Sequence, residues 1–140
     1  MTNYYFDMDG VLANFHEHKD GWKRAMYYNF IFGLKPFIGN VNLINQLLEN
    51  REMNVYISSL AASEEAKKAK IDWLKKYVPN LSEDHIIIIV GKGKKHENMK
   101  TADGILIDDK ESNCKQWRKA GHKAILLTVK GETINLKEAV

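Results

Sequence analysis

The fold is decided close to the start of the chain, where residues 4–11 read YYFDMDGV. The short aromatic run at 4–6 is typical of a buried β-strand, and Asp7 follows it directly. Asp9 and Gly10 come immediately afterwards. This stretch therefore predicts a strand that carries two carboxylates at its carboxyl end.

Beyond this stretch, helical and strand-like patterns alternate along the chain. Ser63 is a suitable N-cap, followed by two glutamates and an apolar face that stops at Pro79. The run HIIIIV at 85–90 is continuously β-branched, as expected of a parallel strand covered on both faces. The predicted strands cover 4–6, 54–59, 85–90, 104–107 and 124–129, and the predicted helices begin near 41, 63 and 112.

This alternation predicts an α/β fold, a three-layer Rossmann-like domain with a mainly parallel sheet. A length of 140 residues suits one domain, which we expect to span 1–140. The aromatic-rich stretch at about 14–39 interrupts the pattern, and we expect it to form a small helical cap inserted after the first strand. Phe15, Trp22 and Tyr27 are its candidates for stacking on a substrate.

Composition limits the classes of protein to consider. The chain is 44% hydrophobic and 28% charged, with no apolar run near the roughly 18 residues that a membrane span needs. Its net charge of +3 is mild, so we expect no stable nucleic-acid partner. The single Cys114 and the N-terminal pattern favour a cytoplasmic protein. We expect no membrane partner, and we leave monomer and homodimer open.

Polar groups follow three of the predicted strands. Asp7 and Asp9 follow the first, Ser58 and Ser59 end the second, and Asp108 with Asp109 follow the fourth. Ligands of parallel α/β sheets sit beyond these carboxyl ends. Clustered carboxylates repel one another unless a cation is present, and oxygen ligands of this kind suit Mg²⁺, which often shares its shell with a substrate phosphate. We therefore expect Mg²⁺ and a small phosphorylated substrate.

The order of these segments resembles the four motifs of the haloacid-dehalogenase-like superfamily. The segments are FDMDGV at 6–11, ISS at 57–59, Lys95, and IDD at 107–109. A closer resemblance is to the 5'(3')-deoxyribonucleotidases, through DMDGVLANF at 7–15, VYI at 55–57 and LIDD at 106–109. This resemblance implies the haloacid-dehalogenase-type fold with a cap, and an enzyme that hydrolyses nucleoside monophosphates.

The resemblance also assigns roles. Asp7 is the expected nucleophile, phosphorylated in the reaction, and Asp9 the expected acid and base. Ser59 would donate to a phosphoryl oxygen, and Lys95 would offset negative charge. The implied metal ligands are Asp7, Asp108 and the backbone carbonyl of Asp9. Asp109 would orient a metal-bound water or the lysine.

For the serine and the lysine of the predicted site, an adjacent residue of the same type is the alternative. Ser58 adjoins Ser59, and Lys94 is the alternative to Lys95 in the lysine-rich run at 91–95. That run lacks the spacing of a P-loop. We expect Cys114 and the tryptophans at 73 and 117 in the core, the five histidines on the surface or in turns, and the tail from residue 130 at the periphery.

The leading hypothesis is a Mg²⁺-dependent phosphomonoester hydrolase acting on nucleoside or deoxynucleoside monophosphates. A second hypothesis keeps the mechanism but changes the substrate to a sugar phosphate or a nucleic-acid 3'-phosphate end. A third is a non-catalytic binding module with the same fold. It is disfavoured because all four carboxylates, Asp7, Asp9, Asp108 and Asp109, are present.

Overall fold

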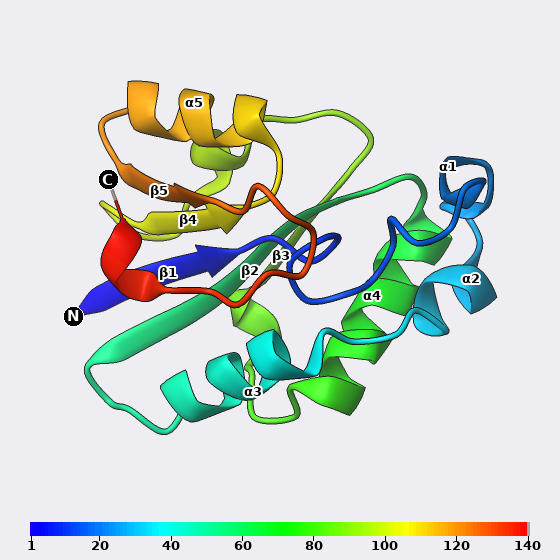
Figure 1. Ribbon diagram of the computed structural model, residues 1–140, viewed down its shortest axis with the longest axis horizontal. Coiled ribbons are helices and arrows are strands. Elements are labelled where there is room, and N and C mark those ends of the chain that lie inside the picture. Colours follow the sequence, from blue (N-terminus) through cyan, green and yellow to red (C-terminus); the bar gives the residue numbers. More distant parts are fainter. Residues whose placement is uncertain (140) are drawn as a thin grey trace.

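The computed structural model describes residues 1–139 and contains one five-stranded parallel sheet. Its strand order is β3-β2-β1-β4-β5, so the first strand lies in the middle (Figure 1). This arrangement confirms the predicted Rossmann-like α/β fold. The strands are β1 (Thr2–Phe6), β2 (Met53–Ala61), β3 (Ile86–Val90), β4 (Ile105–Asp108) and β5 (Lys123–Leu126).

Helices cover both faces of the sheet and complete three layers. In Figure 1, α5 lies on one side of the sheet, and α3 and α4 lie on the other. The longest helix has 14 residues, and within the described chain no helix combines the length and the apolar character needed to cross a membrane. The helices are α1 (Gly21–Arg24), α2 (Tyr28–Phe32), α3 (Ile38–Leu47), α4 (Glu64–Tyr77) and α5 (Glu111–Lys119), with 3₁₀ turns η1 (Glu83–His85), η2 (Lys95–Asn98) and η3 (Leu136–Glu138).

Alternation along the strands divides the core in two. Tyr4 and Phe6 of β1 pack in the larger cluster, with Trp73 of α4, whereas Tyr5 packs in the smaller cluster with Trp117 of α5. Successive strand residues point to opposite faces, so one strand supplies both clusters. Both tryptophans are fully buried, as the sequence predicted, and so is Cys114.

The segment at 14–39 includes two short helices, α1 and α2, of which α2 lies beside α4 (Figure 1). Polar contacts hold it there. The Tyr28 hydroxyl donates to Asp72 at 2.7 Å, the Ser63 hydroxyl donates to the Met26 carbonyl at 2.7 Å, and the Trp73 indole donates to the Leu34 carbonyl at 2.8 Å. The position of a helical insert agrees with the prediction, while its function as a cap stays a prediction.

Three sequence predictions need correction. Strand β2 continues to Ala61, so Ser58 and Ser59 lie inside it rather than at its end, and β5 ends at Leu126 instead of 129. The tail is not peripheral, because Ile134 is buried and its N–H donates to Asn40, while Gly131 N–H donates to the Gly10 carbonyl at 2.8 Å. This segment crosses the carboxyl-end edge of the sheet.

Candidate active site

A cavity of about 530 Å³ opens at the carboxyl ends of the strands. Asp7 and Asp9 line it from the end of β1, Ser59 from β2, and Lys95 from η2. Asp109 also lines it. The sheet therefore brings Asp7, Asp9, Ser59 and Lys95 into one cavity, as the sequence predicted, whereas Asp108 is fully buried and does not line it.

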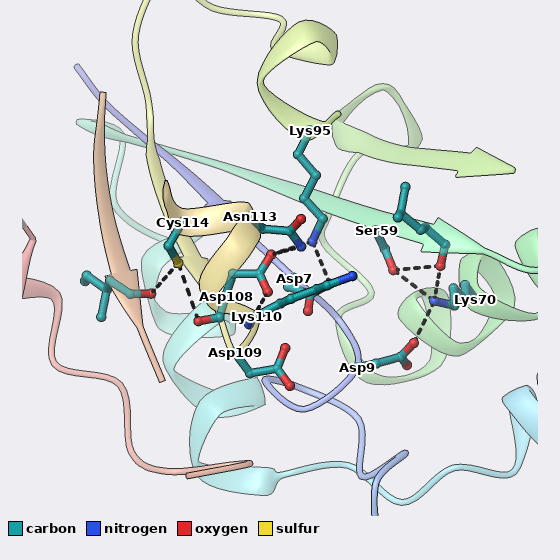
Figure 2. Close-up of polar contacts among 12 residues, drawn as sticks. Asp7, Asp9, Ser59, Lys70, Lys95, Asp108, Asp109, Lys110, Asn113 and Cys114 are labelled. Carbon is teal, nitrogen blue, oxygen red and sulfur yellow. Dashed lines mark hydrogen bonds and ion pairs between the residues drawn. The ribbon is translucent and has the colours of Figure 1, made fainter. Parts of the chain in front are cut away.

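Lys95 joins Asp7, which lines this cavity, to the fully buried Asp108 (Figure 2). Its Nζ lies 2.9 Å from Asp7 Oδ1 and 2.7 Å from Asp108 Oδ2, and all three residues are buried. Lys94 is exposed and its backbone carbonyl accepts from Asn98. Of the two lysines that the sequence left open, Lys95 is the one in contact with the predicted nucleophile.

Burial makes this cluster electrostatically costly. Desolvation raises the pKa of Asp7 to about 6 against the attraction of Lys95, with Asp9 and Asp109 adding to the rise. Burial also raises the pKa of Asp108, and the charge of Asp7 adds to this effect. For Lys95, burial alone would lower the pKa, but Asp7 and Asp108 outweigh it and raise it. One ammonium thus faces two carboxylates in a desolvated pocket.

The donor set fits a hard divalent cation. Oxygens of Asp7, Asp108 and Asp109 all lie within 4.8 Å of one another. Carboxylate oxygens are preferred ligands of Mg²⁺, and a second positive charge would offset the repulsion that Lys95 leaves uncompensated. Asp7 and Asp108 were predicted as ligands. Asp109 joins the cluster, and the role of the Asp9 backbone carbonyl stays a prediction.

Asp108 is fixed by the start of α5. The Lys110 N–H donates to its Oδ1 at 2.9 Å, and the Asn113 amide donates to its Oδ2 at 3.0 Å. These two donors complement Lys95 and hold the carboxylate in one orientation. Sequence reasoning missed Asn113, although its position one turn into a helix that begins after two aspartates was a usable signal.

Asp9 and Ser59 meet at a residue that the sequence analysis did not identify. Lys70 of α4 donates from Nζ to Asp9 Oδ2 at 2.9 Å and to Ser59 Oγ at 2.9 Å (Figure 2). Lys70 lies four residues after Ala66 and three before Trp73, on the buried face of α4. A lysine on the apolar stripe of a helix was the signal that could have found it.

Ser58 and Ser59 are both buried, but only Ser59 lines the cavity. The prediction that preferred Ser59 agrees with this placement. His16 is exposed and lies in a turn, as expected, but it also lines the cavity, and its Nε2 lies 3.3 Å from Asp109 Oδ2, a contact that the sequence did not predict. Lys130 of the tail reaches the same carboxylate oxygen at 2.6 Å.

A family model described as 5' nucleotidase, deoxy (pyrimidine), cytosolic type C protein matches residues 16–136. The chain belongs to this family. Membership confirms the predicted relation to the deoxyribonucleotidases and the predicted enzyme class, a nucleotidase-like phosphatase. The match includes Ser59, Lys95 and Asp108 but starts after Asp7 and Asp9. No curated protein matches the chain.

Proposed function

We propose that this nucleotidase-family protein is a Mg²⁺-dependent 5'(3')-deoxyribonucleotidase that acts through an aspartyl-phosphate on Asp7. The observation that carries the proposal is the contact of Lys95 with both Asp7, which lines the cavity, and the buried Asp108. A nucleophilic carboxylate must be ionised, and an ammonium at 2.9 Å favours that form despite burial.

In the first step, an Asp7 oxygen attacks phosphorus and the bond from phosphorus to the ester oxygen breaks. Ser59 and Lys95 donate to the phosphoryl oxygens, and the carboxylic acid of Asp9 gives its proton to the departing alkoxide. The Mg²⁺ held by Asp7, Asp108 and the Asp9 carbonyl would supply positive charge beside the phosphoryl group.

In the second step, Asp9, now a carboxylate, takes a proton from water. The water oxygen attacks the phosphorus of the aspartyl-phosphate, the bond to Asp7 breaks, and inorganic phosphate leaves. Asp7 returns as a carboxylate and Asp9 as an acid. The positions of Asp7 and Asp9 on the same cavity support this division of roles.

The nucleoside is expected on the side of the cap segment. A smaller cavity of about 200 Å³ is lined by Asp9, Phe15 and Ile31 and adjoins the catalytic one through Asp9. Phe15 packs edge-on against Phe30, which holds the ring in place. Trp22 and Tyr27 are exposed, so contact with a base would need the cap to move.

A nucleic-acid 3'-phosphate end remains the second candidate, because of a neighbouring cavity of about 580 Å³. Lys92, Lys94 and Lys110 line it, and it shares Lys110 with the catalytic cavity. Additional phosphates of an oligonucleotide would find positive charge there.

The test is release of inorganic phosphate from 5'- and 3'-deoxynucleotides, ribonucleotides, sugar phosphates and 3'-phosphorylated oligonucleotides, with Mg²⁺ and with chelator. We expect Mg²⁺-dependent release mainly from deoxynucleoside monophosphates, and loss of turnover by at least about 1,000-fold in Asp7→Asn. Acid quenching should trap phosphate on the Asp7 peptide. Release mainly from another substrate would replace the proposed one, and no release from any would favour a binding module.

A further inference from the structure

Lys70 is a buried cation that the mechanism above does not use. Its side chain is 2% exposed, and its Nζ donates to Asp9 Oδ2 at 2.9 Å, Ser59 Oγ at 2.9 Å and the Leu60 carbonyl at 2.6 Å (Figure 2). An ammonium group has three protons and no acceptor. Each of the three protons is therefore used in one hydrogen bond, and Lys70 is the donor in all three bonds.

Nothing in the packing of α4 requires a charge at this position. Ala66, Ala69, Trp73 and Leu74 on the same helix are buried and apolar. A buried ion pair is often no more stabilising than a well-packed apolar residue, because both charges lose their hydration. The Asp9 side chain is 25% exposed, so water could solvate it without a lysine. The pairing therefore points to a role at the site.

The contact with Asp9 leaves one oxygen of its carboxyl group unassigned. Lys70 takes Oδ2, while Oδ1 is buried and has no hydrogen-bond partner among residues 1–139. Asp9 lines both the catalytic cavity and the smaller cavity under the cap segment. By holding Oδ2, Lys70 fixes the orientation of the Asp9 carboxyl group beside both cavities.

The contact with Ser59 has a parallel consequence. Lys70 cannot accept a hydrogen bond, so Ser59 Oγ must accept in this pair. The hydroxyl proton of Ser59 is then available to a phosphoryl oxygen, since its contact in the fold is a long one of 3.5 Å to the Leu60 carbonyl. One lysine thus orients an acid on one side of the phosphoryl group and a donor on another.

We infer that Lys70 is a positioning residue, which fixes the orientation of the Asp9 carboxyl group for proton transfer to the leaving group and keeps Ser59 as a phosphate donor. This inference rests on the proposed function, because it assumes that Asp9 is the general acid. It predicts a dependence on the leaving group: an alkoxide needs the proton, whereas nitrophenolate leaves without it.

The experiment compares Lys70→Met with wild type on a deoxynucleoside monophosphate and on p-nitrophenyl phosphate. We expect kcat for the nucleotide to fall about 100-fold and kcat for the nitrophenyl ester to fall less than about 10-fold. Asp9→Asn should show the same selectivity, and the double variant should be no slower than Asp9→Asn alone. Lys67→Met, one turn earlier on α4 and outside both cavities, is the matched control and should keep wild-type rates.

Equal losses on both esters, or additive losses in the double variant, would overturn the role of Lys70 while leaving the phosphatase intact. If wild type releases phosphate from neither ester, the proposed function fails and this inference fails with it. Circular dichroism and thermal melting check the fold. If Lys70→Met does not fold, Lys70→Gln replaces it in the same two assays. If neither variant folds, the role of Lys70 is in stability alone and the inference is overturned.

Discussion

At the scale of single residues, the site contains buried carboxylates whose ionised forms are unfavourable in the metal-free protein. Asp7 and Asp108 share one ammonium and are both buried, so burial outweighs the attraction and raises the pKa of each carboxyl group. Active sites commonly keep such arrangements at the expense of stability. Two predictions follow from individual side chains here.

The first concerns Asp7→Asn in metal-free protein. Because the folded pKa of Asp7 is raised from 3.8 to about 6, its ionisation disfavours the folded state, and the contribution of this group to stability is lost as pH rises from about 4 through about 6. The variant cannot ionise. The unfolding free energy of the variant should therefore rise relative to that of wild type over this pH range, by an amount on the order of 2–3 kcal/mol. Urea unfolding at several pH values measures it.

The control for that series is Asp84→Asn, which removes a carboxylate at an exposed position. The difference in unfolding free energy between Asp84→Asn and wild type should not rise between about pH 4 and pH 6. If the Asp7→Asn difference stays constant between about pH 4 and pH 7.5, burial does not disfavour the ionised form of Asp7 in the folded protein.

The second concerns Gly10→Ala. Gly10 has a φ of +83°, and a Cβ atom there would lie 2.2 Å from Asp109 Oδ2. Asp109 would have to move away from the acidic cluster, so we expect apparent Mg²⁺ affinity to fall at least about 10-fold. Mg²⁺ titration followed by thermal shift measures it. Gly121→Ala, which has φ of +99° in open space, is the control that should retain affinity.

At the scale of elements, the segment after β5 closes the sheet edge beside the site. Lys130 reaches Asp109, and Gly131 N–H donates to the Gly10 carbonyl, so this segment contacts both aspartate-bearing loops. Asn40 of α3 donates to the Glu132 carbonyl and accepts from the Ile134 N–H. Sequence reasoning placed this tail at the periphery because its apolar residues show no helical or strand period.

This attachment predicts a large effect for Gly131→Ala. Gly131 has a φ of +72°, and an added Cβ would lie 2.2 Å from the Phe37 ring. We expect a loss of about 2 kcal/mol in unfolding free energy, measured by urea denaturation, against about 1 kcal/mol for Gly121→Ala, where only the backbone conformation is unfavourable. Equal losses of unfolding free energy in the two variants would mean that the Phe37 ring can move away from the added Cβ without destabilising the protein.

At the scale of the whole molecule, metal binding should couple to global stability. Carboxylates brought together by β1 and β4 form the cluster only in the folded protein, so Mg²⁺ should raise the melting temperature, with about 2.7 kcal/mol of stabilisation at 100 times the dissociation constant. Protons compete at Asp7, whose pKa is about 6, so the effect should weaken at about pH 5.

Differential scanning fluorimetry with Mg²⁺ and with chelator at about pH 7.5 and pH 5 measures this effect. Asp108→Asn is the matched variant, since Asp108 is fully buried and belongs to the cluster. It should lose the Mg²⁺-dependent shift at both pH values. An unchanged shift in this variant would place the metal elsewhere.

Sequence alone determined the class of fold and the outline of the site. Short apolar runs identified the strands β1 to β5, and helical spacing with capping residues identified the helices α3 to α5, because the apolar pattern of an element indicates which of its faces are buried. Parallel strands bring their carboxyl ends to one edge, so Asp7 and Asp108 could be placed together from order along the chain. Boundaries were less certain, as β2 and β5 show.

Only the tertiary structure decided which basic side chains contact which carboxylates. Lys95 rather than Lys94 meets Asp7, Lys70 meets Asp9, and Lys130 with His16 meets Asp109. A side chain pairs with whatever lies near its end after packing, and Lys95 and Asp7, for example, are 88 residues apart in the chain. Periodicity fixes the face of an element, but the reach of an ammonium across a cavity depends on how the elements pack.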